Sequence, residues 1–438
     1  MDTFIIKGPA YTAGKVQQAA VRIERGTIVA VSTSDDVGKD ARVITLGPRQ
    51  MLLPAAIDTL AAMRDWAEAP RDTVEAVTKG ALAGGITVVC DQPNTVPRIN
   101  TPELIRQRAQ FVAERSYTDF GISAHPPVEP HRIEEYRDAG AFSVSLFMWD
   151  LRPWNFPRDT DDSAASFRRY AQLGLKGLVF PEELALRETP LEEQGETYAL
   201  EALLRRLDPE WEVRVFATLP DSVERMLAAR TRLPRLLVQV ATHALFMSRE
   251  EGFRRIGIAA SHSPPLRPAA EVEKLRRYAE ERRVDIVTSH HSPHRMPDKY
   301  STEAIPGEFT PKRGYSAIDF AYPLCLTKLG IEHACRMFCE NPARHLGLQK
   351  GLIAPGYEAD LAVVEQSTDV AENNIHQSGA ITPGVWRVDP ATFQSLGKVT
   401  PFTGERLKYR VLKTFVRGAE AYDADTATFR RVAVRRIP

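Results

Sequence analysis

The sequence predicts an α/β protein in which a (β/α)8 TIM barrel is flanked by a small β-sandwich domain. The chain has 438 residues, 43% of them hydrophobic, which is enough for a barrel of about 250 residues and a second, smaller unit. Apolar runs alternate with amphipathic helical segments through the middle of the chain, as βα units do. Both ends instead show the period-two alternation of antiparallel strands.

Residues 1–50 are predicted to form the N-terminal part of the β-sandwich. Strand-like alternation covers residues 4–8, 19–32 and 41–47, with glycine and polar turn residues between these segments. No apolar stripe of helical length occurs there. The segment therefore predicts short antiparallel strands.

Residues 51–348 are predicted to form the barrel. Helical patterns at 72–85 and 101–115 separate the first strands, and helices near 318–330 and 331–347 complete the region. Eight strand-like runs suggest a closed barrel. These runs are MLLPAAID (51–58), ITVVC (86–90), FGISAH (120–125), FSVSLFM (142–148), VRVFATL (213–219), RLLVQVAT (235–242), IGIAAS (256–261) and VDIVTS (284–289).

Residues 349–438 are predicted to complete the β-sandwich. Strand-like alternation returns at 360–366, 409–423 and 430–436. Residues 366–400 carry no clear periodicity and are expected to form a long loop. The two β-rich ends are expected to pair with each other beside the barrel.

Composition and charge restrict the cellular setting. Lys+Arg and Asp+Glu number 57 each and the pI is near 7.2, which argues against a nucleic-acid partner. No stretch approaches 18 uninterrupted apolar residues, and the first residues lack a charged leader, so no membrane association or export is expected. The four cysteines show no CxxC spacing, as is usual for reduced thiols. We expect a cytoplasmic protein.

Eight motifs along nearly the whole chain resemble the dihydroorotases of the cyclic amidohydrolase superfamily. They occur in family order, and such an ordered set is far more specific than one motif. The motifs are LLPAAID (52–58), QPNTVP (92–97), GAFSVSLFM (140–148), PPLR (264–267), SHHSPH (289–294), NPARHLGL (341–348), GYEADLAVV (356–364) and the segment beginning VTPFTGERLKYR at 399.

The resemblance implies hydrolysis or closure of a six-membered cyclic amide by one or two zinc ions, which activate water and polarise the carbonyl. In the family, the first strand ends in Asp-x-His-x-His-x-Arg, and its two histidines bind metal from one face of the strand. Here the histidine positions hold Leu60 and Ala62. Neither side chain has an electron pair to donate.

The other ligands implied by the resemblance have also changed. The fourth-strand lysine, which bridges two metals once carboxylated, corresponds to Ser145. The fifth- and sixth-strand histidines correspond to Phe216 and Gln239, and the eighth-strand aspartate corresponds to His290. Six changed positions predict a pseudoenzyme with no catalytic residue, no metal and no cofactor.

Three residues match the family's binding site for the substrate carboxylate: Arg64, Asn94 and His294. An arginine fork, an amide and an imidazole suit a carboxylate without any metal. The alternative is that Arg64 forms an ion pair within the mouth of a barrel that has lost its metals, that Asn94 stabilises a turn, and that His294 is a surface residue.

A rebuilt metal site is the alternative to a metal-free barrel. His290, His291 and His294, joined by His243 or His262, are the only histidine cluster expected at the catalytic end of the barrel. Adjacent His290 and His291 would point to opposite faces of a continuing strand. The alternative function is therefore an active, zinc-dependent cyclic amidohydrolase.

The sequence looks like the inactive dihydroorotase homologues that assemble with aspartate transcarbamoylase. The resemblance implies a non-catalytic structural subunit of de novo pyrimidine biosynthesis that binds the transferase catalytic subunit and forms a homo-oligomer. A third reading is a metal-free interaction protein, like the non-enzymatic relatives of dihydropyrimidinases.

Overall fold

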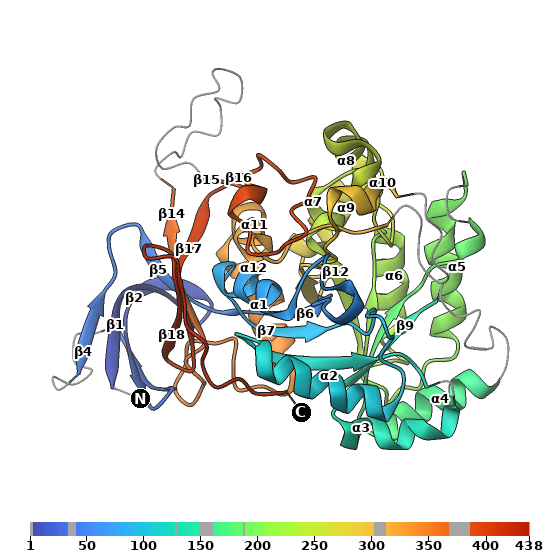
Figure 1. Cartoon of the computed structure of the whole chain (residues 1–438), viewed down its shortest axis with the longest axis horizontal. Helices are drawn as coiled ribbons and strands as arrows, with labels where there is room; N and C mark the ends of the chain where they lie inside the picture. Colours follow the sequence, from blue (N-terminus) through green and yellow to red (C-terminus); the bar gives the residue numbers. More distant parts are fainter. Residues whose placement is uncertain are drawn as a thin grey trace.

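The chain is organised around two β-sheets, a barrel in its middle and a sheet made by its two ends (Figure 1). The computed structural model describes residues 3–33, 41–127, 129–148, 161–186, 189–301, 312–367 and 386–437. This arrangement confirms the predicted fold class, a (β/α)8 barrel with a flanking β domain.

Eight parallel strands form the barrel, and their sheet order is β13-β12-β11-β10-β9-β8-β7-β6. The ring closes between its first and last strands, where the Ala62 N–H donates to the carbonyl of His291 at 2.8 Å. The strands are β6 (Ala56–Ala61), β7 (Ile86–Asp91), β8 (Asp119–Ala124), β9 (Ser143–Phe147), β10 (Lys176–Phe180), β11 (Val213–Phe216), β12 (Leu236–Ala241) and β13 (Ile286–Thr288).

Helices surround the barrel (Figure 1). The first of them begins where Thr73 caps it, its hydroxyl accepting the Ala76 N–H at 3.1 Å, as Thr does at an N-cap. The helices are α1 (Val74–Ala83), α2 (Pro102–Arg115), α3 (Tyr136–Ala139), α4 (Asp161–Gln172), α5 (Glu192–Leu204), α6 (Pro220–Ala229), α7 (Thr242–Phe246), α8 (Arg249–Ile256), α9 (Ala269–Glu280), α10 (Met296–Tyr300), α11 (Ala321–Leu329), α12 (Ile331–Cys335) and α13 (Asn341–Leu346).

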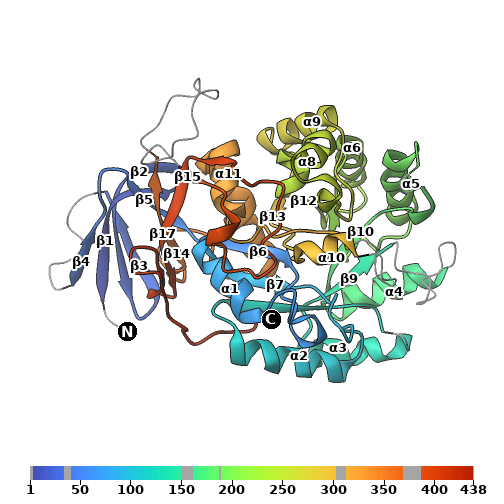
Figure 2. The ribbon, with the colours of Figure 1, turned by 45° about the horizontal axis from the view of Figure 1, so that its top comes forward.

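The flanking sheet combines strands from both ends of the chain, which lie together on one side of the barrel in Figures 1 and 2. Antiparallel pairing of β14 with β5 joins the two ends. Ile6, Val21, Leu52, Leu361 and Phe415 belong to its buried core. The strands are β1 (Phe4–Thr12), β2 (Lys15–Glu24), β3 (Thr27–Ser32), β4 (Arg42–Thr45), β5 (Gln50–Pro54), β14 (Leu361–Gln366), β17 (Tyr409–Val416), β18 (Ala419–Asp423) and β19 (Thr428–Phe429).

The set of predicted barrel strands contains one wrong assignment and one omission. The segment IGIAAS is not a strand, because Ile256 ends α8 and residues 257–260 form a 3-10 helix. Conversely, the run KGLVF, which was not among the predicted strands, forms β10 in the middle of the barrel. The predicted number of strands was right because one wrong assignment compensated for one omission.

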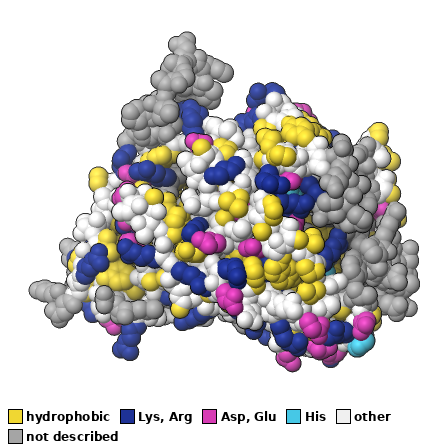
Figure 3. All heavy atoms as spheres, viewed as in Figure 1, with side chains coloured by type: hydrophobic (Ala, Val, Ile, Leu, Met, Phe, Trp, Pro, Cys, Tyr) yellow, Lys and Arg dark blue, Asp and Glu magenta, His cyan; other side chains and the backbone are white. Residues whose placement is uncertain are grey.

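The predicted loop at 366–400 is partly regular. Residues 368–385 lie outside the described part of the chain, and beyond them β15 (Trp386–Arg387) pairs with β16 (Arg406–Leu407). On the face drawn in Figure 3, lysines and arginines are interspersed with acidic residues, and hydrophobic side chains gather in several patches. Within the described residues, no helix combines the length and apolarity that crossing a bilayer requires.

Candidate functional site

The residues at the predicted ligand positions lie inside the barrel, in the middle of its strands or toward their carboxyl ends. Leu60 is in β6, Ser145 in β9, Phe216 at the end of β11 and Gln239 in β12. Each of these four side chains is at most 1% exposed. The carboxyl ends of barrel strands are where this fold places its catalytic groups, so this region is the candidate site.

An apolar cluster occupies this part of the barrel. It is formed by Leu60, Phe147, Leu178, Phe180, Phe216 and Ala241. The ring of Phe180 stacks on Phe147 with centroids 4.6 Å apart and lies 5.0 Å from the ring of Phe216. His290 packs edge-on against Phe216 at 5.1 Å. Strands from opposite sides of the barrel therefore meet through the six side chains of this apolar cluster, none of which has a lone pair for a metal.

The observed strand order corrects two of the assignments made from the resemblance. Since β10 is the fifth barrel strand, Phe180 stands at its carboxyl end, where the sequence analysis placed Phe216. Phe216 ends the sixth strand, and Gln239 lies on the seventh. The missed signal was the run Phe180-Pro181-Glu182 directly after KGLVF. The fifth- and sixth-strand ligand positions therefore hold Phe180 and Phe216, and Gln239 does not stand at a ligand position.

Polar side chains deeper in the barrel form hydrogen bonds with one another. The Ser145 hydroxyl donates to Oε1 of Gln92 at 2.9 Å. Oε1 of Gln239 accepts from the Thr59 hydroxyl at 3.0 Å and from Nη1 of Arg214 at 3.2 Å. Burial lowers the pKa of Arg214 to about 10. A serine hydroxyl cannot form the bridging carbamate of a lysine, and Ser145 serves here as a hydrogen-bond donor.

The aspartate of the first-strand motif keeps a structural role. Asp58 is fully buried and accepts hydrogen bonds from the hydroxyls of Thr288 and Ser289 and from the Leu60 N–H. Burial raises the pKa of Asp58, and these hydrogen bonds oppose the rise. The carboxylate thus ties β6 to the end of β13 across the closure of the barrel.

Arg64, the predicted carboxylate-binding arginine, already holds a carboxylate of the protein. Nη1 of Arg64 lies 3.0 Å from Oε1 of Glu68, and both side chains are about 6% exposed or less. Its Nη2 donates to the Ser292 hydroxyl at 3.0 Å. Oε1 of Glu68 also accepts from Arg71 at 2.6 Å. Glu68 was missed by the sequence analysis, since an acidic residue four positions after an arginine gives no signal outside a helix.

The other two predicted carboxylate ligands are placed differently. His294 is buried, and its Nε2 lies 3.3 Å from Nη2 of Arg64. Burial and the Arg64 charge hold the pKa of His294 well below its usual range. Asn94 is exposed, and its main-chain carbonyl accepts from Arg64 at 3.3 Å. The structure therefore brings Arg64 and His294 together and leaves the amide of Asn94 at the surface.

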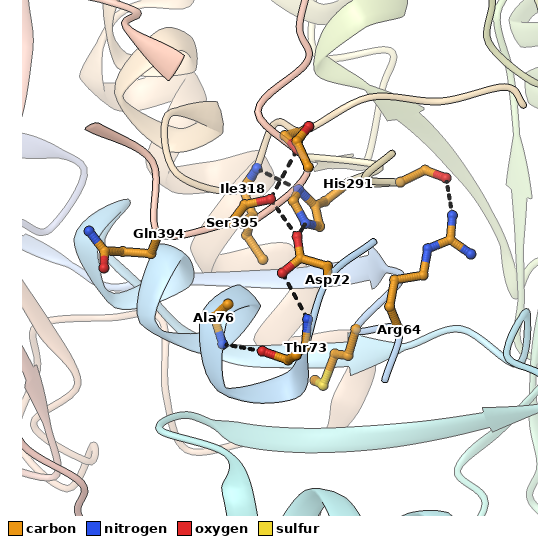
Figure 4. A network of polar contacts seen from close by, with 12 residues as sticks. Arg64, Asp72, Thr73, Ala76, His291, Ile318, Gln394 and Ser395 are labelled. Atoms are coloured by element: carbon orange, nitrogen blue, oxygen red, sulfur yellow. Dashed lines mark hydrogen bonds and ion pairs between the residues drawn. The ribbon is translucent and has the colours of Figure 1, made fainter. Parts of the chain in front are cut away.

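His291 belongs to a separate network, shown in Figure 4. Its Nδ1 accepts the N–H groups of Ala317 at 3.1 Å and Ile318 at 3.3 Å. Its Nε2 lies 3.7 Å from Oδ2 of Asp72, a carboxylate that also accepts from the Ser395 hydroxyl. Both ring nitrogens therefore face protein groups. His291 anchors the loop after β13 and belongs to no histidine cluster in the part of the chain that the structure describes.

His290 instead joins His243 and His262. One potential ligand atom from each of these three residues lies within 4.8 Å of the others. His243 is in α7, His262 follows the 3-10 helix at 257–260, and His290 follows β13 with a left-handed φ of 49°. All three side chains are buried. The cluster thus gathers at the ends of the seventh and eighth strands, beside Phe216.

The electrostatics of the three histidines favour neutral rings. Burial lowers the pKa of His243 to about 3. Burial, His243, His290 and Lys299 hold the pKa of His262 well below its usual range, against a smaller effect of the Pro264 backbone. A neutral imidazole has a free lone pair on one nitrogen, which is the form that binds metals.

The residues present do not fit the two-zinc centre that the resemblance implies. Its positions hold Leu60, Ala62, Ser145, Phe180 and Phe216, and only His290 at the eighth strand has a nitrogen ligand atom. Packing of the phenylalanine rings also takes up the space between these strands. No reaction step through such a centre follows from this geometry.

Comparisons with known proteins agree with the fold. The model of the amidohydrolase family matches residues 325–420. A dihydroorotase from Thermococcus kodakarensis is 25% identical over 433 residues, covering 97% of this chain and 96% of that protein. An allantoinase from Streptomyces avermitilis is 27% identical, with 91% of each chain covered.

Two solved structures of similar architecture are named as a hydantoinase and a dihydropyrimidinase. The L-hydantoinase from Arthrobacter aurescens superposes with a TM-score of 0.86 at 21% identity, covering both chains completely. The dihydropyrimidinase from Brevibacillus agri has a TM-score of 0.81 at 19% identity, covering 99% of this chain and 98% of the other. At such identities these structures establish the shared architecture of barrel and flanking sheet.

Proposed function

We propose that the chain, which is similar to dihydroorotases over nearly its whole length and matches the amidohydrolase family model over residues 325–420, is a dihydroorotase homologue without hydrolytic activity. The observation that carries this proposal is the apolar cluster of Leu60, Phe147, Leu178, Phe180, Phe216 and Ala241. Activation of water by zinc needs ligand nitrogens or oxygens and an open coordination position. Aliphatic and aromatic side chains supply neither.

The proposed role is structural. A barrel that keeps its fold but has no catalytic activity acts by binding a partner through its surface. The resemblance points to the catalytic subunit of aspartate transcarbamoylase as that partner. In this proposal the chain forms a homo-oligomer and stabilises the transferase in de novo pyrimidine biosynthesis. The support for this partner is the resemblance of the motifs and of the lost ligand set.

An activity assay tests the loss of hydrolysis. Purified, zinc-supplemented protein is assayed in both directions for interconversion of carbamoyl aspartate and dihydroorotate, beside an active dihydroorotase under the same conditions. We expect no turnover above the uncatalysed reaction. Turnover that survives repeated purification and responds to zinc would contradict the proposal.

Co-expression tests the structural role. The chain and an aspartate transcarbamoylase catalytic subunit from the same organism are expressed together, and the mass of the purified assembly is measured. We expect one complex that contains both chains at a fixed ratio and a transferase more stable to heat than the isolated subunit. Separate elution of the two proteins at micromolar concentration would exclude the partner.

The alternative is an active metal-dependent cyclic amidohydrolase with a rebuilt site. The specific observation in its favour is the group of His243, His262 and His290 at the catalytic end of the barrel. The sequence predicts this site at His290, His291 and His294, but His291 and His294 have protein partners elsewhere. The turnover assay separates the two functions.

A further inference from the structure

The ring nitrogens of the three-histidine cluster lack hydrogen-bond partners. Both nitrogens of His243, both of His262 and Nδ1 of His290 are buried and have no such partner within the described residues. Buried polar atoms are paired in nearly all proteins. Five such atoms on three adjacent rings therefore call for a binding partner that the described residues do not provide.

The rings already lie close to one another. Their centroids are 4.0 Å apart for His243 and His262, 4.6 Å for His262 and His290, and 5.4 Å for His243 and His290. Two nitrogens on one tetrahedral zinc ion are separated by about 3.3 Å, given Zn–N bonds of roughly 2.0–2.1 Å. Since the ligand atoms here lie within 4.8 Å of one another, a closure of about 1.5 Å suffices.

The surroundings suit a metal held by neutral ligands. The ring of Tyr315 packs edge-on against His262 at 4.8 Å, and its buried hydroxyl also lacks a partner within the described residues. Phe180 and Phe216 cover His290 on another side. Imidazole is a ligand for zinc and neighbouring transition metals, whereas calcium and magnesium prefer oxygen. The donor set therefore selects a zinc-like ion.

We propose that His243, His262 and His290 form a mononuclear site for a zinc-class divalent ion that stabilises the barrel. His243 and His262 stand at none of the ligand positions that the resemblance implies, so the site is displaced toward the seventh and eighth strands. Its bound ion joins α7, the loop before PPLR and the end of β13. Zinc binding without turnover is compatible with the proposed loss of hydrolysis, while turnover would overturn that loss alone.

Metal titration of the full chain tests the site. Protein stripped with a chelator is titrated with Zn²⁺ and with Co²⁺, and bound metal, the visible Co²⁺ absorption and the melting temperature are recorded. We expect one ion per chain, intense tetrahedral Co²⁺ bands and a higher melting temperature. A chain that retains no ion after dialysis against micromolar zinc would overturn the proposal.

Variants identify the ligands. His243→Leu and His262→Leu are each expected to weaken zinc binding by more than the roughly 100-fold that loss of an outer-shell partner costs. The control is His125→Leu, because His125 is buried and its Nε2 also lacks a partner within the described residues. This control should bind zinc like the wild type. Equal loss in all three variants, or loss in none, would contradict the assignment.

The melting temperatures of the variants without metal show whether the substitutions have disturbed folding. Removing an unpaired buried imidazole should leave the melting temperature of the stripped protein unchanged or higher, while the rise produced by zinc disappears. A metal-binding site therefore predicts that the variants keep the melting temperature of the stripped form but lose the increase that zinc produces. Three histidines with only a packing role predict a lower melting temperature in both forms, and that result would overturn the proposal.

Discussion

Phe180 links the two halves of the apolar cluster inside the barrel. Its ring contacts Phe147 and Phe216, and it also borders His290 at 5.6 Å. Its position at the end of the fifth strand is one where the resemblance implies a metal-binding histidine. One aromatic side chain thus removes a ligand and fills the space that a metal and its water would need.

Truncation of Phe180 should therefore be costly for stability. We expect Phe180→Ala to lower the free energy of unfolding by about 3–5 kcal/mol, because a fully buried ring leaves a cavity that the strands cannot close. Urea denaturation measures the change. The control Phe253→Ala removes a ring that is 41% exposed on α8 and should cost less than about 1 kcal/mol. Equal effects would show that the cluster is not tightly packed.

Glu68 occupies the fork of Arg64, where the resemblance implies a substrate carboxylate. We expect Glu68→Ala to lower the free energy of unfolding by about 3 kcal/mol, because it leaves the buried Arg64 charge without a counter-ion. Added acetate or dihydroorotate should then raise the melting temperature of the variant more than that of the wild type.

The control for Glu68 is Glu75→Ala, which removes an exposed partner of Lys79. Such a surface pair is worth about 0–1 kcal/mol, and no carboxylate should rescue the variant. If acetate and dihydroorotate stabilise the wild type and Glu68→Ala equally, Glu68 does not compete with ligands for Arg64.

Among the elements, the barrel strands show how far sequence reasoning reaches. Seven of the eight were predicted, because runs such as RLLVQVAT are too long and too β-branched for a loop. KGLVF was missed since its short apolar run, Gly177 to Phe180, lies between two helical segments and looks like part of a helix. IGIAAS alternates like a strand, yet it continues directly from the helix that begins at Arg249.

The site was predictable only in part, for reasons of geometry. The sequence shows which ligand positions changed, and the loss of histidine at residues 60 and 62 needs no structure. It does not show that His290 turns toward His243 and His262, because that grouping depends on a left-handed residue after β13. Contacts between loops of different strands are set by tertiary packing and have no sequence period.

The barrel and the flanking sheet are joined by a buried ion cluster. Nζ of Lys350 lies 3.1 Å from Asp119 at the start of β8, 2.8 Å from Glu358, and also pairs with Asp360 before β14. Arg417, between β17 and β18, pairs with the same Asp119. Burial alone would lower the pKa of Lys350, and the three carboxylates together raise it. The cluster fixes the two elements to each other.

Replacement of Lys350 should weaken the attachment of the flanking sheet to the barrel. We expect Lys350→Met to lower the free energy of unfolding by about 3–5 kcal/mol, because the buried Asp360 carboxylate loses its counter-ion. The control Lys413→Met breaks the half-exposed pairs with Glu420 and Asp423 and should cost about 1 kcal/mol or less. Urea denaturation followed at two probes, one per sheet, measures both variants. Equal losses would show that the cluster is no stronger than a surface pair.

Across the molecule, buried histidines outside the three-histidine cluster should contribute to the response to acid. Burial lowers the pKa of His125 to about 3 and, despite the nearby Glu212 carboxylate, that of His345 to about 4. The pKa of His294 is also held well below its usual range. Between about pH 4 and 6.5 the unfolded chain therefore binds more protons than the folded one.

Stability should consequently be highest above about pH 6.5 and should fall as the pH drops toward 4, by up to about 1.4 kcal/mol per pH unit for each such histidine. Urea denaturation of chelator-treated protein at pH 7, 6 and 5 measures the slope. His125→Phe removes one buried titrating group while keeping a ring against Phe147, so its profile should be flatter. His131→Gln changes an exposed histidine and should leave the slope unchanged. If the free energy of unfolding of His125→Phe has the same pH slope as that of the wild type, burial of neutral histidines does not govern the acid response of this barrel.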